Sequence, residues 1–369
     1  MNVGIFSINE NVYSETFIAA HKNLLQGHIF YYHGNSYESL QIERLHKPIA
    51  GFRLKQRVFM RLSKSYRKKH TRCDLIKRSL LENKIDVILV EYGTLAYSML
   101  PLFKIIDIPF IVHFHGYDAS VNTIIESCKN YKEVFQKASA IISVSKQMES
   151  NLLGLGCPKE KLYYNPYGPN DCFLEVESTC KTETLIGIGR FVDKKAPYLT
   201  ILAFNKALKE VPSAKLVMAG NGPLLNTCQN LVAYLGLVNS VSFPGVISAS
   251  EFTEFLVNSR AYVQHSITAS NGDMEGTPLA ILEAQASSVP VISTLHAGIK
   301  DVVINNETGI LVEEKDVDGM ARGMITLLQN INLAKQMGRK AKENITENFS
   351  MAKHINGINQ IIIKVTKQN

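Results

Sequence analysis

Short apolar runs alternate with longer amphipathic stretches along all 369 residues of the chain. This alternation predicts an α/β fold, in which buried parallel strands are joined by helical crossovers. In the first half we expect strands at Val3–Ile8, His28–His33, Asp86–Glu91, Phe110–Phe114 and Ala140–Val144. In the second half we expect strands at Thr184–Ile188, Lys215–Ala219, Val241–Phe243, Ala261–His265 and Val289–Ser293.

Each half carries its own set of strands and therefore reads as a doubly wound, Rossmann-like unit. The length of the chain also favours two domains over one. The segment Asn165–Asn170 is rich in Pro, Gly and Asn, which makes it the best linker. We expect one domain over residues 1–165 and a second over residues 171–349.

Composition is ordinary for a soluble globular protein, with 46% apolar and 20% charged residues. No apolar run approaches the roughly 18 residues that a membrane-spanning helix needs. Met1–Ile8 lacks the basic start of a secretory signal, and the six cysteines are scattered without a Cys-x-x-Cys pair. These features predict a cytoplasmic protein with reduced thiols.

A phosphate-binding helix start is predicted just after the strand at Ala261–His265. Thr277 is a good N-cap residue, and Pro278 fits the first helical position, where no N–H is needed. The N–H groups of Leu279 and Ala280 would then point out of the helix start, where they can bind phosphate.

Two acidic residues flank this helix start. Glu275 lies in the loop before it, and Glu283 lies about a turn and a half inside the helix. Both carboxylates could reach a ligand that has phosphate between two hydroxyl-rich ends, and a nucleoside diphosphate sugar has that shape. The simpler alternative is a pair of surface glutamates near a helix start.

The stretch Gly272–Glu283 resembles the Glu-x7-Glu motif of family 4 retaining glycosyltransferases. The wider segment His265–Pro290 is similar to bacterial exopolysaccharide and colanic-acid-type members. The resemblance implies that Glu275 contacts the donor sugar as a catalytic residue and that Glu283 contacts the ribose. It also implies that Gly276 lies in the cleft and that the donor diphosphate meets Thr277, Leu279 and Ala280.

The same resemblance implies the GT-B architecture, two Rossmann-like doubly wound domains that face a central cleft. Residues 1–165 would bind the acceptor and residues 171–349 the nucleotide-sugar donor. A last helix over residues 350–369 would cross back onto the first domain, and an apolar pattern at Ile355, Ile358, Ile361 and Ile362 gives this crossing some support.

The segment Gly187–Lys195 resembles the family's Gly-Arg-x4-Lys motif, whose cations grip the donor diphosphate. The matching residues are Arg190 and Lys195. Fixed cations stabilise the charge that a departing nucleoside diphosphate gains, so no metal and no cofactor are expected. The family usually has Gly where this chain has Ala196, and Lys194 and Lys195 could instead be plain surface residues.

The run Phe110–Asp118 reads as a buried strand that ends in His115 and Gly116, where doubly wound sheets place ligands. It is similar to the family's His-Gly-x-Asp, whose histidine sits near the anomeric carbon of the donor. The resemblance gives that catalytic role to His115 and places Gly116 and Asp118 in the cleft. A core histidine is the alternative, and His113 and His115 lack an evident third metal ligand.

The first predicted strand is not followed by a glycine-rich loop, since no glycine lies between Gly4 and Gly27. This argues against a nicotinamide dehydrogenase. Ser14 and Glu15 stand there instead, as in an exopolysaccharide-type subset of the family. They could help to place donor or acceptor in the cleft, or simply begin a helix.

Positive charge is concentrated in the first half. Residues 1–165 hold 22 Lys and Arg against 14 Asp and Glu, whereas residues 166–369 hold 18 against 19. Residues 44–73 carry eleven of these cations and no acid, with an apolar residue every fourth position from Leu54 to Tyr66. We expect this stretch to bind an anionic membrane surface, because related enzymes often extend a lipid-linked glycan. Nucleic acid is not expected, since no aromatic and basic binding motif accompanies the patch, and a solvated face is the alternative.

Together these features predict a retaining, metal-independent hexosyltransferase of exopolysaccharide biosynthesis, peripheral on the inner face of the plasma membrane. Its donor would be a UDP- or GDP-linked sugar and its acceptor a glycan or lipid-linked glycan. A GT-B isomerase or hydrolase of nucleotide sugars is one alternative. A non-catalytic sugar-nucleotide-binding partner is another, but it would predict damage at Glu275, Arg190 or Lys195.

Overall fold

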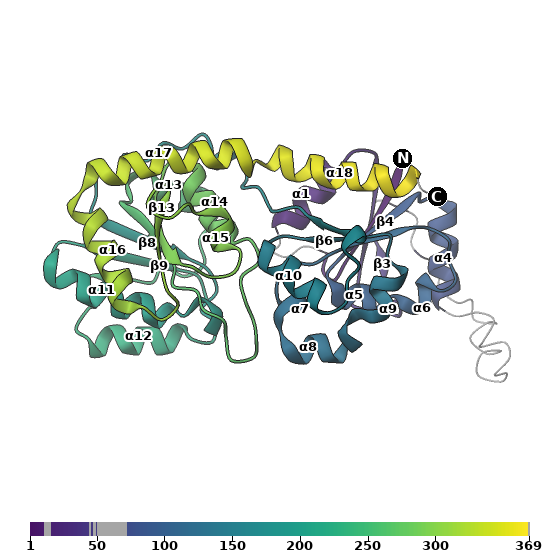
Figure 1. Cartoon of the computed structure of the whole chain (residues 1–369), viewed down its shortest axis with the longest axis horizontal. Helices are drawn as coiled ribbons and strands as arrows, with labels where there is room; N and C mark the ends of the chain where they lie inside the picture. The colour runs from purple at the N-terminus through teal and green to yellow at the C-terminus, as the bar shows by residue number, and fades with distance from the viewer. Residues whose placement is uncertain (11–15, 44–45, 47–48, 50–71, 368–369) are drawn as a thin grey trace. The chain divides into compact units, whose positions relative to one another are not determined.

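A computed structural model describes residues 1–10, 16–43, 46, 49 and 72–367, and these residues form two compact α/β units (Figure 1). The first unit takes in the described residues of Met1–Ser143, Glu149–Asn165 and Ile355–Asn369. The second unit takes in Val144–Met148 and Pro166–His354. The main change of unit therefore falls between Asn165 and Pro166, within the linker segment.

The first unit is built on one sheet, which has the strand order β3-β2-β1-β4-β5-β6-β7 among the described residues. Its strands are β1 (Asn2–Ser7), β2 (His28–His33), β3 (Gln41–Ile42), β4 (Val87–Glu91), β5 (Phe110–His113), β6 (Ala140–Ser143) and β7 (Leu162–Tyr164). Neighbouring strands run parallel, apart from the antiparallel pair β2 and β3. The strand order reverses between β1 and β4, and ligands of doubly wound sheets bind beyond the carboxyl ends of strands at such a point.

Helices cover this sheet, and the last helix of the chain belongs to the same unit from Ile355 on. They are α1 (Thr16–Leu24), α4 (Arg72–Glu82), α5 (Gly93–Ser98), α6 (Leu100–Phe103), α7 (Tyr117–Ser120), α8 (Asn122–Ser127), α9 (Lys132–Lys137), α10 (Lys146–Gly154) and α18 (Met351–Lys367). Helix α18 buries Ile355, Ile358, Ile361 and Ile362. The Asn359 Oδ1 accepts a hydrogen bond of 3.1 Å from the Gln26 backbone N–H, which ties α18 to the loop after α1.

The second unit is built on a fully parallel sheet of strand order β10-β9-β8-β11-β12-β13. Its strands are β8 (Thr184–Ile188), β9 (Lys215–Ala219), β10 (Val241–Ser242), β11 (Ala261–Val263), β12 (Val291–Thr294) and β13 (Gly309–Val312). Its helices are α11 (Pro197–Glu210), α12 (Leu225–Tyr234), α13 (Ala249–Asn258), α14 (Leu279–Ala286), α15 (Ile299–Val302), α16 (Val317–Gln329) and α17 (Ile331–Asn348). Here the order reverses between β8 and β11, so ligands are expected beyond those two strands.

The α/β fold class is confirmed, and each predicted strand corresponds to an observed one with ends shifted by at most two residues. Strand β11 ends at Val263, before the predicted His265. The reason is that His265 leaves the ladder: its N–H donates to the Thr200 hydroxyl at 3.3 Å, and its Nε2 accepts the Lys315 N–H at 2.8 Å. Strands β3, β7 and β13 were not predicted. Among the described residues, no helix combines the length and the apolar character needed to cross a membrane.

Candidate active site

An ion pair between Lys195 and Glu275 lies at the centre of the candidate site in the second unit. Lys195 ends a short helical turn after β8, and Glu275 lies in the loop before α14. The Lys195 Nζ is 3.0 Å from the Glu275 Oε1. Burial alone would raise the pKa of Glu275, but Lys195 and then Lys194 lower it to about 2. Glu275 is therefore a buried carboxylate that stays ionised at neutral pH.

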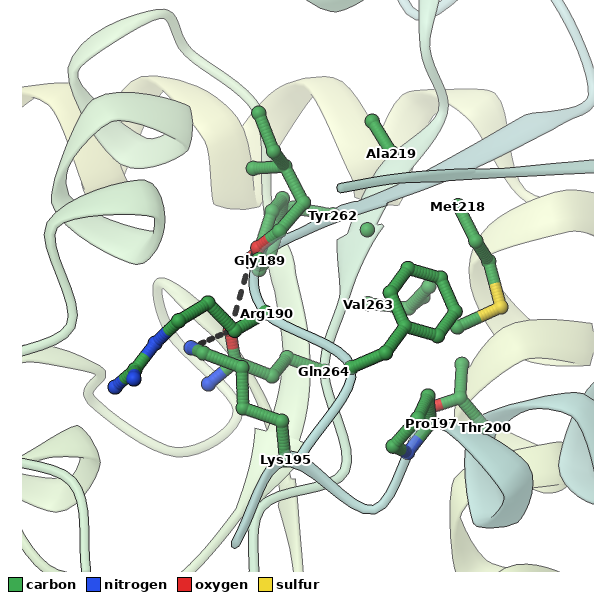
Figure 2. Close-up of a pocket in the computed structure, with 13 residues that line it drawn as sticks. Gly189, Arg190, Lys195, Pro197, Thr200, Met218, Ala219, Tyr262, Val263 and Gln264 are labelled. Atoms are coloured by element: carbon green, nitrogen blue, oxygen red, sulfur yellow. Dashed lines mark hydrogen bonds between the residues drawn. The ribbon is translucent and has the colours of Figure 1, made fainter. Parts of the chain in front are cut away.

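A small pocket of about 30 Å³ lies at the carboxyl ends of β8 and β11, and Lys195 of this ion pair lines it (Figure 2). Gln264 lines it and holds Lys195 through a hydrogen bond of 3.1 Å from Nζ to Oε1. The same Gln264 oxygen lies 2.9 Å from the Tyr262 hydroxyl, and its amide nitrogen donates to the Ser266 hydroxyl at 2.8 Å. Lys195 is thus fixed between Gln264 and Glu275, on one wall of the pocket.

Arg190 lines the same pocket from the end of β8 and is exposed to solvent. Within the part of the chain that the structure describes, its side chain has no ion-pair partner. The structure therefore brings Arg190, Lys195 and Glu275 together, as the sequence predicted.

The turn behind the two cations is made by Ala196 in the left-handed conformation, with φ 33° and ψ 53°. Alanine here adopts the backbone that glycine adopts more easily, so the departure from the family pattern leaves the turn in place.

The start of α14 differs from the predicted capping arrangement. Thr277 was predicted as the N-cap, but that position is taken by Pro278, whose ψ of 107° is extended rather than helical. The Thr277 hydroxyl instead donates to the Val144 carbonyl oxygen. Leu279 and Ala280 are the first two helical residues, so their N–H groups have no acceptor inside the helix. The helix thus starts one residue later than predicted, and Leu279 and Ala280 take its first and second positions instead of its second and third.

The loop that carries Glu275 is held by residues that the sequence motifs did not identify. Lys194 is buried rather than exposed, and its Nζ donates to the Asp273 Oδ1 and to the Met274 carbonyl, both at 3.0 Å. The His296 Nε2 accepts the Glu275 backbone N–H at 3.2 Å, while its Nδ1 lies 2.6 Å from the Glu314 Oε1. The adjacent lysines therefore have separate tasks, since Lys194 fixes the loop and Lys195 contacts its carboxylate.

Gly276 and Glu283 flank the helix start. Gly276 is packed so closely that a methyl group added at Gly298 would overlap its carbonyl oxygen. Glu283 lies on α14, half-buried, and burial raises its pKa to about 7. Glu283 does not line the pocket that Arg190 and Lys195 line.

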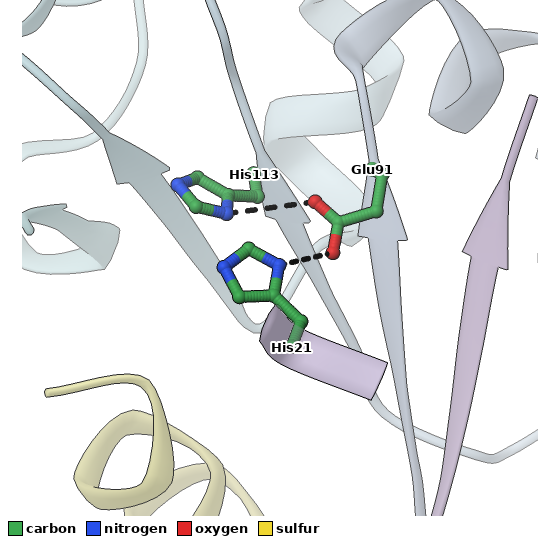
Figure 3. A group of neighbouring side chains, drawn as sticks. All are labelled: His21, Glu91 and His113. Carbon is green, nitrogen blue, oxygen red and sulfur yellow. Dashed lines mark hydrogen bonds and ion pairs between the residues drawn. The ribbon is translucent and has the colours of Figure 1, made fainter. Parts of the chain in front are cut away.

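A second cluster of polar residues lies in the first unit at the carboxyl ends of β4 and β5. Glu91 ends β4, is fully buried, and pairs in register with His113 at the end of β5 (Figure 3). The Glu91 Oε1 lies 2.7 Å from the Nδ1 of His21, which comes from α1. The Glu91 Oε2 lies 2.8 Å from the His115 Nε2 and 3.5 Å from the His113 Nδ1. The predicted residue His115 is thus bonded to a carboxylate that the motif did not include.

Asp118 and Gly116 shape the backbone around His115. The Asp118 Oδ1 accepts the N–H groups of His115 and Gly116, both at 3.0 Å, and its Oδ2 accepts the Gly93 N–H at 2.8 Å. Gly116 has φ 152°, a conformation that side chains rarely allow. The predicted cleft residues Gly116 and Asp118 therefore act on the local backbone, and Asp118 itself is fully buried.

Among the residues that the structure describes, His21, Glu91 and His113 have the composition to hold a metal ion, since their ligand atoms all lie within 4.8 Å of one another. Two ligands at ordinary Zn–N and Zn–O distances in a tetrahedral site are separated by about 3.3 Å. The 2.7 Å between His21 and Glu91 is instead the length of a hydrogen bond. As they stand, these residues fit a hydrogen-bonded cluster better than a metal site.

Two predicted features lie outside the described residues. The first is the pair of predicted cleft residues Ser14 and Glu15, and the second is most of the basic segment 44–73, which was predicted to bind a membrane surface. Their predicted roles stay predictions.

Two protein-family models match the chain. "Glycosyltransferase Family 4" matches residues 27–169, and "Glycosyl transferases group 1" matches residues 176–344. The first match falls mainly in the first unit, and the second falls in the unit that holds Arg190, Lys195 and Glu275. Together they account for most of the chain, which therefore belongs to the family 4 glycosyltransferases.

Similar proteins include a glycosyltransferase of colanic acid biosynthesis from Escherichia coli, 26% identical over 242 residues, or 64% of this chain and 60% of the relative. The amylovoran biosynthesis glycosyltransferase AmsK of Erwinia amylovora is 28% identical over 66% of this chain and 61% of its own length. The chain thus matches about 60% of the length of these relatives.

Among solved structures, Anabaena HepE in complex with UDP has a TM-score of 0.76 and 14% identity, with both chains covered in full. This likeness extends over both units, and the GT-B fold with two Rossmann-like domains is confirmed.

Proposed function

We propose that this protein is a retaining glycosyltransferase that moves a hexose from a nucleoside diphosphate sugar to a glycan or lipid-linked glycan. The observation that carries the proposal is the Lys195–Glu275 pair, together with the pocket that Lys195 and exposed Arg190 both line. Cations beside a buried carboxylate suit a donor whose diphosphate and sugar are adjacent. The neighbouring start of α14 adds backbone donors for phosphate.

Each group has a task in this proposal. Arg190 and Lys195 bind the diphosphate and stabilise the charge that it gains as the bond to the sugar breaks. Glu275 accepts hydrogen bonds from the sugar hydroxyls and orients the ring, and Glu283 accepts hydrogen bonds from the ribose. Because two cations and a helix start already neutralise the diphosphate, the mechanism requires no metal ion.

The relatives favour a transferase over an isomerase or hydrolase of nucleotide sugars. The relatives from Escherichia coli and Erwinia amylovora are both named as glycosyltransferases of polysaccharide biosynthesis. The Mycobacterium tuberculosis relative, 25% identical over 63% of each chain, is named as a GDP-mannose-dependent mannosyltransferase of a phosphatidylinositol mannoside. HepE has been solved with UDP-glucose. These names support a UDP- or GDP-linked hexose as donor and a glycan or glycolipid as acceptor.

The acceptor side of the proposal includes an anionic membrane surface. The support is the charge of residues 44–73, eleven Lys and Arg without an acid. Vesicles of anionic lipid should bind the protein at low salt and release it at high salt, because the screening length falls to about 3 Å at 1 M. Replacing Arg61, Lys64, Arg67 and Lys68 with Gln should abolish binding, and equal binding to neutral vesicles would contradict the proposal.

Product analysis tests the reaction itself. The purified protein is incubated with UDP-glucose or GDP-mannose and a lipid-linked glycan extract, and the products are examined by mass spectrometry and NMR. We expect one hexose to be added with the anomeric configuration of the donor. Release of free hexose as the sole product would favour the hydrolase, and an altered nucleotide sugar would favour the isomerase.

A further inference from the structure

Buried Glu91 contacts three histidines, and no motif of the sequence points to it. Its two oxygens lie at hydrogen-bond distance from different imidazoles, Oε1 at 2.7 Å from His21 and Oε2 at 2.8 Å from His115. Burial alone would raise the pKa of Glu91, but the surrounding imidazoles hold it well below its ordinary value. A carboxylate is an acceptor only, so both facing nitrogens must carry hydrogen.

This requirement fixes the tautomer of His115. The proton lies on Nε2, toward Glu91, and in the neutral ring Nδ1 is then the nitrogen with the lone pair. The ring also stacks on Phe17 at a centroid distance of 4.6 Å and contacts the tilted ring of Tyr92 at 4.5 Å. Its backbone N–H donates to the Asp118 Oδ1 at 3.0 Å. His115 is therefore constrained by a hydrogen bond, by aromatic contacts and at the backbone.

We propose that Glu91 is the positioning residue of this site, which sets the tautomer and the orientation of His115 for the transfer reaction. Its relation to His115 is that of the carboxylate that orients a catalytic imidazole in other enzymes. His21 supports Glu91 on the opposite oxygen and so fixes the rotation of the carboxylate. The consequence for turnover rests on the proposed function, whereas the consequence for the tautomer does not.

Glu91→Gln separates this role from simple space filling. Glutamine has nearly the same shape, but it has a single acceptor oxygen and an NH₂ group that donates. It cannot accept from His21 and His115 at once, so one imidazole must turn its lone pair toward the amide. Glu91→Asp keeps two acceptor oxygens. Glu133→Gln is the matched control, because Glu133 is an exposed carboxylate of the same unit, 2.8 Å from Lys104.

The tautomer is measured by long-range ¹H–¹⁵N NMR of the histidine rings, with the His115 signals assigned by their loss in His115→Asn. In the wild type and in Glu133→Gln we expect an Nε2–H ring at His115. Glu91→Gln should change the tautomer of the ring that faces the amide nitrogen, to Nδ1–H at His115 or to Nε2–H at His21, and Glu91→Asp should restore the wild-type tautomers at least in part. Unchanged tautomers of both His21 and His115 in a folded Glu91→Gln protein would overturn the proposal.

Turnover is measured with whichever of UDP-glucose and GDP-mannose the wild type uses. We expect Glu91→Gln to lower kcat at least 10-fold with little change in the KM for the donor. The loss should not add to that of His115→Asn, because both changes remove the same oriented imidazole. Additive losses of kcat would contradict the positioning role. Bound zinc would contradict it as well, if plasma mass spectrometry found one equivalent in the wild type and none in His21→Ala and Glu91→Gln. If the wild type showed no transfer activity, the proposed function would be contradicted. The NMR measurement would still test whether Glu91 sets the tautomer of His115.

Discussion

Lys195 and Glu275 form an ion pair of 3.0 Å with only 16% and 8% of their side chains exposed. Each has been assigned a part of the donor, the diphosphate to Lys195 and the sugar to Glu275. The pair therefore holds two binding groups in place before a ligand arrives. Such preorganisation lowers the cost of ordering the site when the donor binds.

Removing one member of this pair should destabilise the protein. Lys195→Met leaves Glu275 buried and charged, and loss of one partner of a buried ion pair costs about 3 kcal/mol of unfolding free energy. Part of that loss should return in Lys195→Met/Glu275→Gln, where the buried charge is gone. Urea titration of both variants measures the effect.

Lys206→Met provides the control for this comparison, because Lys206 pairs with Asp318 on the surface of the same unit. It should leave the free energy of unfolding nearly unchanged. Equal losses in Lys206→Met and Lys195→Met would show that the partly buried pair has no special contribution.

Arg190 should contribute to nucleotide affinity without contributing to stability. It lines the pocket, is exposed, and has no ion-pair partner within the described ranges. Arg190→Ala should weaken binding of UDP or GDP by about 1.5–3 kcal/mol, the range for hydrogen bonds to charged groups. Isothermal calorimetry measures this loss, with Arg322→Ala as the control because Arg322 is an exposed arginine of the same unit. An unchanged affinity in folded Arg190→Ala would remove Arg190 from the diphosphate site.

Sequence motifs identified three residues that the structure brings together, because those residues lie in short local segments. Arg190, Lys195 and Glu275 each belong to a loop that follows a predictable strand, and parallel strands bring such loops to one edge of the sheet. The role of Lys194 was not predictable, because two adjacent lysines look alike in a sequence. Only the turn that ends at Ala196 determines which of the two is buried.

The first unit shows the opposite case. His115 was found through its local motif, but its partner Glu91 is 24 residues away, and Glu91 bonds to His21 across 70 residues. Such contacts depend on strand order and register rather than on spacing. A glutamate at the end of an apolar strand was the available signal, since a charge in a buried strand needs a partner.

Nucleotide affinity should depend on pH through Glu283. Burial raises the pKa of Glu283 to about 7, so the carboxyl is largely protonated at pH 6 and ionised at pH 8. An ionised acceptor makes the stronger hydrogen bonds to ribose hydroxyls. UDP or GDP affinity should therefore rise between pH 6 and pH 8, and Glu283→Gln should flatten that rise. The phosphate of the nucleotide also titrates in this range, so the difference between wild type and variant is the decisive measurement.

The raised pKa of Glu283 has a consequence for stability as well. The folded state holds this proton more tightly than the unfolded chain, whose glutamate titrates near 4.3. The stabilising contribution of protonated Glu283 is complete below that pH and is lost as the pH rises through about 7. Urea unfolding of wild type and Glu283→Gln at pH 5 and pH 8 should show a smaller difference between the two pH values in the variant.

Sugar transfer should survive removal of divalent metal ions. Arg190, Lys195 and the start of α14 supply the positive charge that a metal would bring to the diphosphate. We expect the rate of transfer to be the same with and without EDTA, measured with the donor that the wild type accepts. Loss of activity in EDTA that Mg²⁺ or Mn²⁺ restores would exclude the metal-independent mechanism.

Replacing Glu275 and replacing Glu283 should have different effects, the first on turnover and the second on donor binding. Glu275 is buried beside Lys195, so its carboxylate can reach the sugar that follows the diphosphate. A sugar held in the reactive orientation lowers the barrier, and Glu275→Gln should reduce turnover by roughly 10²-fold, equivalent to about 2.7 kcal/mol. Donor affinity should change little.

Glu283→Gln should instead weaken donor binding with a smaller effect on turnover, since ribose takes no part in the reaction. Steady-state kinetics and nucleotide titrations of both variants distinguish the two patterns. The comparison also controls for damage to the fold, because both residues lie within one loop and helix. If Glu275→Gln retained near-normal turnover, its carboxylate could not orient the sugar, and the assignment of the Lys195–Glu275 pair to the reacting end of the donor would be wrong.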